Sequence, residues 1–178
     1  MKRLDEIDLG ILDLLQTEAK ISQADIGRRV GLSAAAVNER IKKLERSGVI
    51  RKVVALLDDE KVGCEITAFV EVLVDHPSNE KGFLDGMKRL DEVQEVHHVT
   101  GEFSCLLKIK VHDRNALRRL LLDRINVVKG VSRTRTLVVL STSKEETRIL
   151  LKENRVSKRQ ARERDNPGNP DRCMEVGG

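Results

Sequence analysis

The sequence predicts an α+β fold with two domains, and three observations support this prediction. Residues 4–46 place apolar side chains three or four positions apart, which is the period of amphipathic helices. Residues 66–140 change several times between β-branched strand patterns and helical spacing. The polar stretch DDEKVG at 58–63 separates these two parts. We expect a three-helix domain at 1–50, a hinge strand and linker at 51–65, a βαββαβ domain at 66–145 and a charged tail at 146–178.

The first expected helix covers residues 4–17, where Ile7, Ile11 and Leu14 share one face. A second, short helix begins after Ser22, whose hydroxyl can cap it, and ends at Gly31, where a left-handed residue fits. Ser33 can cap a third helix that ends at Gly48. A short helix, a glycine turn and a second helix have the spacing of a helix-turn-helix.

The exposed side of this helix pair is basic. Residues 28–52 contain eight Lys or Arg and two Asp or Glu, so this segment attracts phosphate. With only three Phe and no Trp or Tyr in the chain, stacking on unpaired bases is disfavoured, and double-stranded DNA suits the composition better than single-stranded RNA. The alternative is an ordinary helical hairpin with a solvated basic face. The predicted DNA-binding residues are Ser22, Gln23, Ser33, Ala34, Ala35, Asn38, Glu39, Arg40, Lys42, Lys43 and Arg46.

The second domain shows its order through changes of period. Residues 49–57 are expected to be a strand or an extended connector. Four strands are then expected at 66–75, 93–99, 103–111 and 131–140, with a helix after the break at Pro77, Ser78 and Asn79 and another from Asp113 to Gly130. The resulting βαββαβ order is the ferredoxin-like arrangement, with both helices on one sheet face. No helix remains for the other face, so we expect a second copy of the chain to cover it in a homodimer.

The remaining features predict a cytoplasmic protein without a metal or cofactor. Three cysteines lie far apart, without zinc spacing or an even number for disulfides, and no apolar run is long enough to span a bilayer. His97 and His98 are adjacent on a strand and therefore point to opposite faces, so they would not chelate one ion. Beyond Ser141 we expect a charged helix to about Arg164 and disorder in the last dozen residues.

Five segments resemble the Lrp/AsnC, or feast/famine, family of transcriptional regulators. They read LDEIDLGILDLLQTEAKIS, DIGRRVGLS, ERIKKLERSGVIR, HHVTGEFSCLLKI and TRTLVVL, and they follow the order of the family, whose pattern covers about residues 1–145. The resemblance implies an N-terminal helix-turn-helix joined by a hinge strand to a βαββαβ effector domain. It also implies dimers that assemble into tetramers or octamers, and an amino acid bound between neighbouring effector domains.

Two motifs depart from the family pattern. Recognition helices in the family often begin Ser-Pro, whereas here Ser33 is followed by three alanines, which changes the residues facing the groove. The commoner turn Gly-Asp-Tyr-Asp appears here as Gly101, Glu102, Phe103 and Ser104. The tail beyond Ile149 matches nothing in the family pattern.

The same turn is the predicted effector site. A free amino acid needs amide donors for its carboxylate and oxygen acceptors for its ammonium, and a glycine turn can supply the donors. Thr100, Gly101, Glu102, Phe103 and Ser104 form this predicted site, with the hydroxyls of Thr134 and Thr136 as further candidates. The alternative is a simple hairpin turn without a ligand.

The sequence therefore favours a sequence-specific regulator that binds double-stranded DNA, is not an enzyme, and responds to a small effector such as an amino acid. One alternative is an architectural protein that wraps DNA with little sequence preference. The other is an enzyme similar to siroheme decarboxylases, which share the two-domain layout and use histidine chemistry. The absence of Tyr and Trp from this chain argues against the enzyme.

Overall fold

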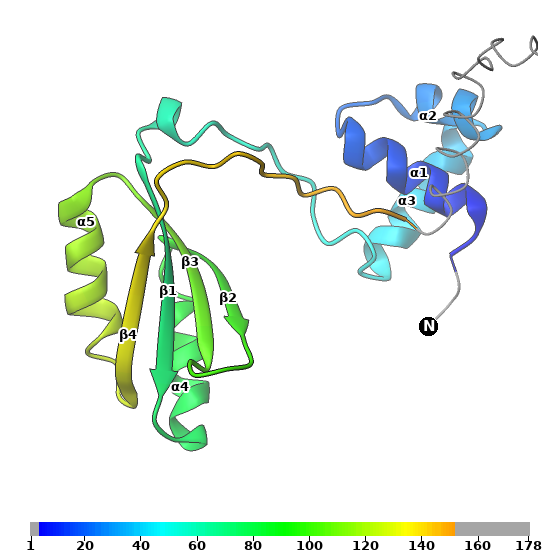
Figure 1. The fold of residues 1–178 in the computed structure, drawn as a ribbon. Helices are drawn as coiled ribbons and strands as arrows, with labels where there is room; N and C mark the ends of the chain where they lie inside the picture. Colours follow the sequence, from blue (N-terminus) through cyan, green and yellow to red (C-terminus); the bar gives the residue numbers. More distant parts are fainter. Residues whose placement is uncertain (1–3, 152–178) are drawn as a thin grey trace, which may run out of the picture. The chain divides into compact units, whose positions relative to one another are not determined.

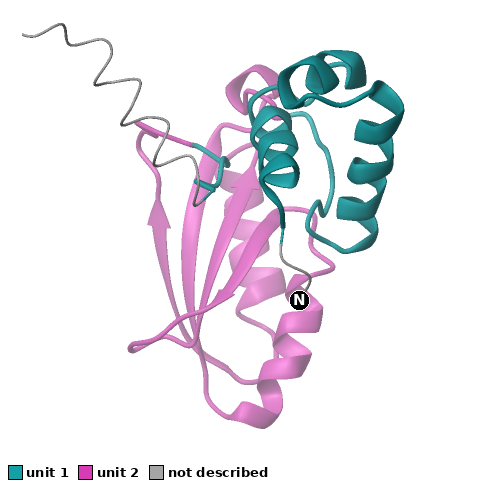
Figure 2. Ribbon diagram, turned by 90° about the vertical axis from the view of Figure 1, so that its right-hand side faces the viewer, with its two compact units in different colours: residues 1–55, 146–178 teal, residues 56–145 magenta. Residues whose placement is uncertain are grey.

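The computed structural model describes residues 4–151, which form two compact units (Figure 2). The first unit contains residues 4–55 together with 146–151, and the second contains residues 56–145. The chain therefore passes from the first unit to the second and then returns. No helix within residues 4–151 is long and apolar enough to cross a membrane.

The first unit consists of three helices, α1 (Glu6–Thr17), α2 (Gln23–Val30) and α3 (Ala34–Arg46), shown in Figure 1. The predicted helical domain is thus confirmed. Asp5 begins α1 with a full capping box, because its carboxylate accepts from the Asp8 amide while the Asp8 carboxylate accepts from the Asp5 amide. The buried side chains of the three helices form one small core, with these central members: Ile11, Leu12, Ile26, Val37 and Leu44.

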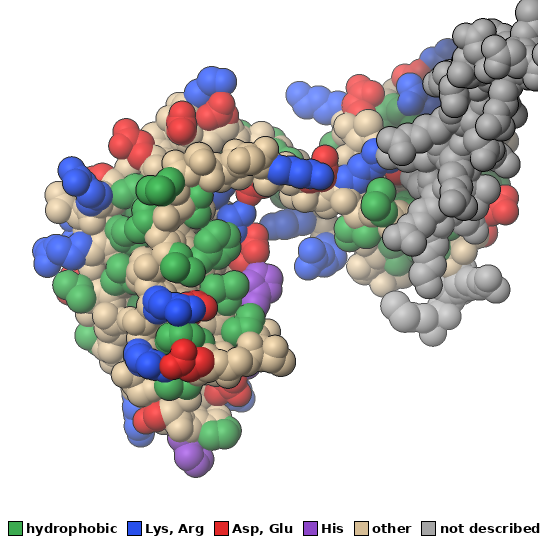
Figure 3. Space-filling model, viewed as in Figure 1, with side chains coloured by type: hydrophobic (Ala, Val, Ile, Leu, Met, Phe, Trp, Pro, Cys, Tyr) green, Lys and Arg blue, Asp and Glu red, His purple; other side chains and the backbone are tan. Residues whose placement is uncertain are grey.

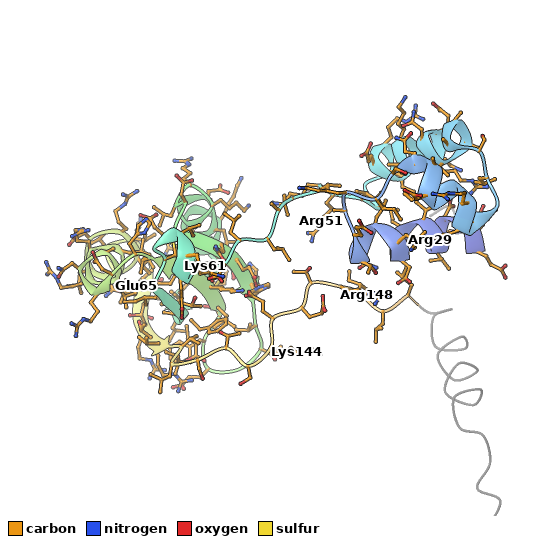
Figure 4. All side chains as sticks on the ribbon, turned by 90° about the horizontal axis from the view of Figure 1, so that it is seen from above. Arg29, Arg51, Lys61, Glu65, Lys144 and Arg148 are labelled. Carbon is orange, nitrogen blue, oxygen red and sulfur yellow. The ribbon has the colours of Figure 1, made fainter. Side chains whose placement is uncertain are left out.

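The returning segment packs against α1. Its backbone exchanges two hydrogen bonds with one side chain: Gln16 donates through Nε2 to the Ile149 carbonyl (3.2 Å), and the Ile149 amide donates to Gln16 Oε1 (2.7 Å). Arg148, labelled in Figure 4, donates to Asp13 Oδ1 at 2.5 Å. Leu151 packs on the helical core. This segment thus completes the first unit.

The predicted helix from Ser141 is wrong for the residues that the structure describes. Residues 141–151 contain no helix. Gln16 bonds the backbone amide and carbonyl of Ile149, and this pairing takes the place of helical hydrogen bonds. The rest of that expected helix and the expected disorder of the last dozen residues lie outside the described part of the chain.

The second unit is a four-stranded antiparallel sheet with the strand order β2-β3-β1-β4. The strands are β1 (Ile66–Val74), β2 (Val93–His98), β3 (Cys105–Val111) and β4 (Val131–Val138). The helices are α4 (Pro77–Met87) and α5 (Arg114–Arg119), with a 3₁₀ turn η1 (Glu60–Val62) and a π-helical turn η2 (Leu120–Ile125) that continues α5. This confirms the ferredoxin-like order.

Helix α4 begins earlier than the sequence suggested. Pro77, Ser78 and Asn79 were expected to break the chain, yet Pro77 is the first helical residue. Proline fits there because the first helical amide has no intrahelical partner. His76 caps the helix, since its Nδ1 accepts from the Ser78 amide at 3.2 Å.

Both helices cover one face of the sheet, as predicted. Phe83 of α4 and Leu117 of α5 belong to one core with the alternate residues of β1 and β3 that point to the same side. The other face, which we call the open face, is turned to the viewer in Figures 1 and 3. It mixes apolar side chains with paired charges, including Lys108, whose Nζ lies 2.7 Å from Glu145 Oε1. No helix covers the open face within the described residues.

The segment between the units is an extended connector. Residues 51–58 have no strand pairing, so the hinge strand expected around 49–57 does not form in the single chain. Four apolar side chains in this connector are more than half exposed: Val53, Val54, Leu56 and Leu57. No residue from 51 to 58 is buried, because a single chain offers this segment no partner strand.

Candidate nucleic-acid interface and ligand site

Two glycines shape the turn between α2 and α3. Gly31 ends α2 with φ +72°, a left-handed conformation that glycine adopts without strain. The Leu32 amide then donates to the Gly27 carbonyl at 2.9 Å, which folds the turn back on α2. A Cβ on Gly27 would overlap the backbone carbonyl of Leu32. Gly27 therefore allows the close approach that sets the angle between the helices, and sequence reasoning missed this role.

Seven of the predicted DNA-binding residues lie on one side of α3. We call it the recognition face, and it consists of exposed Ala34, Ala35, Glu39, Lys42, Lys43 and Arg46 with half-buried Asn38. Small residues at its start let the backbone come close to base edges. A hydrogen bond holds Asn38 in place, because Gln23 at the start of α2 donates to Asn38 Oδ1 at 3.1 Å.

The predicted serines have capping roles. Ser22 accepts from the Asp25 amide at 3.1 Å, and Ser33 accepts from the Ala36 amide at 3.2 Å. The Ser22 hydroxyl also donates to Asp25 Oδ2 at 2.6 Å, and this bond, followed by the bond from Arg28, lowers the pKa of Asp25. Both serines are exposed at helix starts, where backbone amides can meet a phosphate.

Arg40 does not share the recognition face. Its Nη1 donates to Asp5 Oδ2 and to Asp8 Oδ1, both at 2.7 Å. The bond from Arg40 is the main reason why the pKa of Asp5 lies below its usual range. Arg40 therefore joins α3 to α1, and its position does not support the prediction that it contacts DNA. Arg40 lies three residues after buried Val37, and this spacing could have indicated that Arg40 shares the inward side of α3.

The remaining basic residues of α2 and α3 are only partly paired with acids. Lys42 Nζ lies 3.7 Å from Glu39 Oε1, and the Arg28 guanidinium pairs with the Asp25 carboxylate. Among the described residues, Arg29, Lys43 and Arg46 have no acidic partner within salt-bridge distance. Unpaired cations next to a helix-turn-helix can bind phosphate, so charge and geometry agree here.

The predicted effector turn, residues 100–104, connects β2 to β3. Gly101 has φ +124°, a backbone conformation that residues other than glycine rarely adopt. Glu102 pairs with Arg133 of β4, and both side chains are more than half exposed. An exposed carboxylate beside an exposed guanidinium matches the two opposite charges of a free amino acid.

The last two residues of the turn are occupied within the chain. Phe103 is 6% exposed, because the guanidinium carbons of Arg133 and Arg135 lie 5.0 and 5.2 Å from its ring centre. The Ser104 hydroxyl accepts from the Val74 amide (2.9 Å) and donates to the Val72 carbonyl (3.3 Å). These two side chains hold the turn against β1 and β4.

The structure separates Thr134 and Thr136 from this turn. They alternate with Arg133 and Arg135 along β4, so they point to the helix-covered face. There they line a cavity of about 540 Å³ with apolar residues of α5 and η2, and Thr134 donates to Asn126 Oδ1 at 3.0 Å. The seven predicted effector residues therefore do not form one site within a single chain.

The two adjacent histidines lie on opposite sheet faces, as predicted. His97 Nε2 lies 2.9 Å from Glu95 Oε2, and this contact is the main cause of a lowered pKa of Glu95. His98 points to the helix side, where its Nδ1 lies 3.0 Å from Glu80 Oε1 of α4. Each histidine thus has its own acidic neighbour.

Comparison with known proteins gives the same two-part division. A family model described as winged helix-turn-helix DNA-binding matches residues 4–51, and one described as Lrp/AsnC ligand binding domain matches residues 67–149. The leucine-responsive regulatory protein of Escherichia coli K12 is 38% identical over 153 residues, which cover 85% of this chain and 93% of that protein.

Solved structures agree with this match. A transcriptional regulator from Neisseria meningitidis, solved in complex with L-Met, has a TM-score of 0.79 and 29% identity over 85% of this chain and 99% of that one. The leucine response regulatory protein of Mycobacterium tuberculosis has a TM-score of 0.74 and 30% identity, covering 82% of this chain and 99% of that one. Because sequence and fold agree along both units, the chain belongs to the Lrp/AsnC family of transcriptional regulators.

Proposed function

We propose that this regulator binds double-stranded DNA sequence-specifically through the recognition face and that a small effector, such as an amino acid, controls it. The observation that carries the proposal is the recognition face, which combines small residues at its start, a positioned Asn38 and cations without acidic partners among the described residues. An amide can read a base edge, and a cation can bind the backbone phosphates. The proposal includes a cytoplasmic location, because the curated relatives are bacterial and bacterial DNA lies in the cytoplasm.

A homodimer is part of the proposal. Leu137 on the open face is 49% exposed, and the connector exposes Val54 at 55% and Leu56 at 74%. A second copy would bury such side chains and would present two recognition faces to successive major grooves. Tetramers or octamers built from these dimers would lengthen the contacted DNA.

Substitutions at Lys43 and Asn38 are expected to affect DNA binding in different ways. Lys43→Ala should weaken binding to every duplex alike and reduce the slope of log K against log salt by about 0.9, because one phosphate contact is lost. Asn38→Ala should remove about 1–3 kcal/mol of discrimination at one base pair. Enrichment from a random duplex pool, followed by titrations at several salt concentrations, measures both effects.

The control and the alternative are tested in the same experiment. Glu18→Ala at the end of α1 should change neither property, because Glu18 lies outside the recognition face. Equal weakening on all sequences by Asn38→Ala would remove it from base readout. A long footprint without any enriched sequence would favour the architectural, DNA-wrapping alternative instead.

The effector is proposed to bind at the turn of residues 100–104. The Glu102–Arg133 pair can separate around a zwitterion, with Arg133 on the carboxylate and Glu102 on the ammonium. The Neisseria neighbour was solved with L-Met. The cavity beside Thr136 is a second candidate location for the effector. The apolar side chain of an amino acid would fit there, between α5 and β4.

Gly101→Ala is expected to weaken effector binding at least tenfold. A Cβ at this φ strains the turn and moves the Glu102 amide, although nothing lies within 4 Å of the added carbon. Calorimetric titration of the wild type and the variant with the common amino acids measures the loss of effector affinity. Thr136→Val is the matched control on the opposite face. If this control loses binding and Gly101→Ala keeps it, the cavity is the site.

The proposal assigns no enzymatic activity. The competing enzyme, similar to siroheme decarboxylases, would use His97 or His98, and both already face a carboxylate. Incubation of the purified chain with siroheme, followed by detection of decarboxylated product, tests this alternative directly.

A further inference from the structure

Three side chains from different elements meet where the β2–β3 hairpin closes. They are Glu80 of α4, His98 at the end of β2 and Cys105 at the start of β3, and we call them the hairpin cluster. Each offers one ligand atom, and these atoms all lie within 4.8 Å of one another. Within residues 4–151, this is the one group of three or more such side chains close enough to hold a cation.

The sheet register brings His98 and Cys105 together. They lie directly opposite each other in the β2–β3 pair, so their side chains point to the same face. The Val99 amide donates to the Ser104 carbonyl at 3.1 Å, which makes the next pair, 98 and 105, the non-hydrogen-bonded kind. Side chains in such pairs lie closer than in hydrogen-bonded pairs. Helix α4 covers the same face and adds Glu80.

One of the three groups is buried and the other two are partly exposed, so a cation could reach the cluster from one side. Cys105 is fully buried, whereas the His98 and Glu80 side chains are 53% and 33% exposed. An ion can enter past the imidazole and the carboxylate and then reach the thiol. Its fourth ligand would be water from the same side.

We propose that the hairpin cluster binds a divalent cation of the zinc class, through His98 Nδ1, Glu80 and Cys105 Sγ. Sulfur, imidazole nitrogen and carboxylate oxygen are all zinc ligands, with bond lengths of about 2.0–2.3 Å in a tetrahedral site. Ligand atoms at these bond lengths lie about 3.3–3.8 Å apart. The present 3.0 Å between His98 Nδ1 and Glu80 Oε1 needs to widen only slightly.

Binding would release one proton, because the thiol must become a thiolate and its proton passes to the solvent. Burial, and then the charge of Glu80, raise the pKa of Cys105, so the bound cation must offset the cost of ionising this thiol. A bound ion would also join both ends of the hairpin around residues 99–104. The turn proposed for the effector would then be braced by the metal.

The experiment uses Co²⁺ as a probe on the full, tag-free chain. A Cys64→Ser, Cys173→Ser background leaves Cys105 as the sole thiol, which removes the competing pair of Cys64 Sγ and His112 Nδ1, 3.9 Å apart. We expect a thiolate-to-cobalt charge-transfer band in the near ultraviolet and strong visible bands of tetrahedral cobalt, saturating at one ion per chain. Added Zn²⁺ should remove them.

Variants of the exposed ligands decide the outcome, because Cys105→Ser alters the core. His98→Gln and Glu80→Gln should each weaken cobalt binding by about 10- to 100-fold, with unchanged circular dichroism. The matched control is His97→Gln, on the opposite face, which should bind as before. Absence of the charge-transfer band in the background chain, or a band that His98→Gln leaves unchanged, would overturn the proposal.

Discussion

Gly27→Ala is expected to destabilise the helix-turn-helix unit by about 1–3 kcal/mol, the usual range for overpacking a closely packed site. The added Cβ would overlap the Leu32 carbonyl, which is backbone and cannot rotate away. The turn must open, so α3 changes its angle to α2 and the recognition face moves with it. DNA affinity should fall at least tenfold even at temperatures where the unit remains folded. Thermal unfolding followed by circular dichroism and duplex titration measure the two effects.

The matched control makes the same chemical change in a helix of the other unit. A Cβ on Gly82, inside α4, would meet nothing within 4 Å. Gly82→Ala should therefore stabilise its helix by about 0.5–1 kcal/mol, through helix propensity alone, and should leave DNA binding unchanged. An equal stability gain from Gly27→Ala would show that the turn has room and that the close approach to Leu32 is not required.

The element order was predictable because it depends on local patterns. Apolar spacing located α1, α2 and α3, and Ser33 and Gly31 set the limits of the turn. The role of Gly27 was not predictable, since it depends on a backbone approach that only the folded turn creates. The inward position of Arg40 was equally hidden, because its two acceptors lie more than thirty residues away in sequence.

The predicted effector residues show a different limit. Alternation along β4 places Thr134 and Arg133 on opposite faces of the sheet. Which of the two shares a face with Glu102 depends on the pairing of β4 with β1 and on the path of the turn. In the same way, the β2–β3 register placed His98 opposite Cys105, a partner that sequence spacing did not reveal.

Arg40→Met is expected to destabilise the same unit without removing its DNA contacts. The variant keeps an apolar stem but leaves Asp8, whose side chain is only 10% exposed, without the guanidinium that now binds it. A poorly solvated carboxylate that loses its partner costs about 1–3 kcal/mol of stability. Lys43→Met is the matched control on the recognition face. It should weaken DNA binding and leave thermal stability nearly unchanged, whereas Arg40→Met should do the reverse.

The pH dependence of the melting temperature shows whether Arg40 stabilises the unit through its ion pairs or through packing of its aliphatic stem. Arg40 lowers the pKa of Asp5 in the folded chain, so the pair contributes stability above the ordinary aspartate pKa of about 3.9. That contribution is lost as the pH falls through the lowered pKa of the folded state. The difference in melting temperature between the wild type and Arg40→Met should therefore be full at neutral pH and shrink below about pH 4. A difference that stays constant down to pH 3 would mean that Arg40 acts through its aliphatic stem rather than its charge.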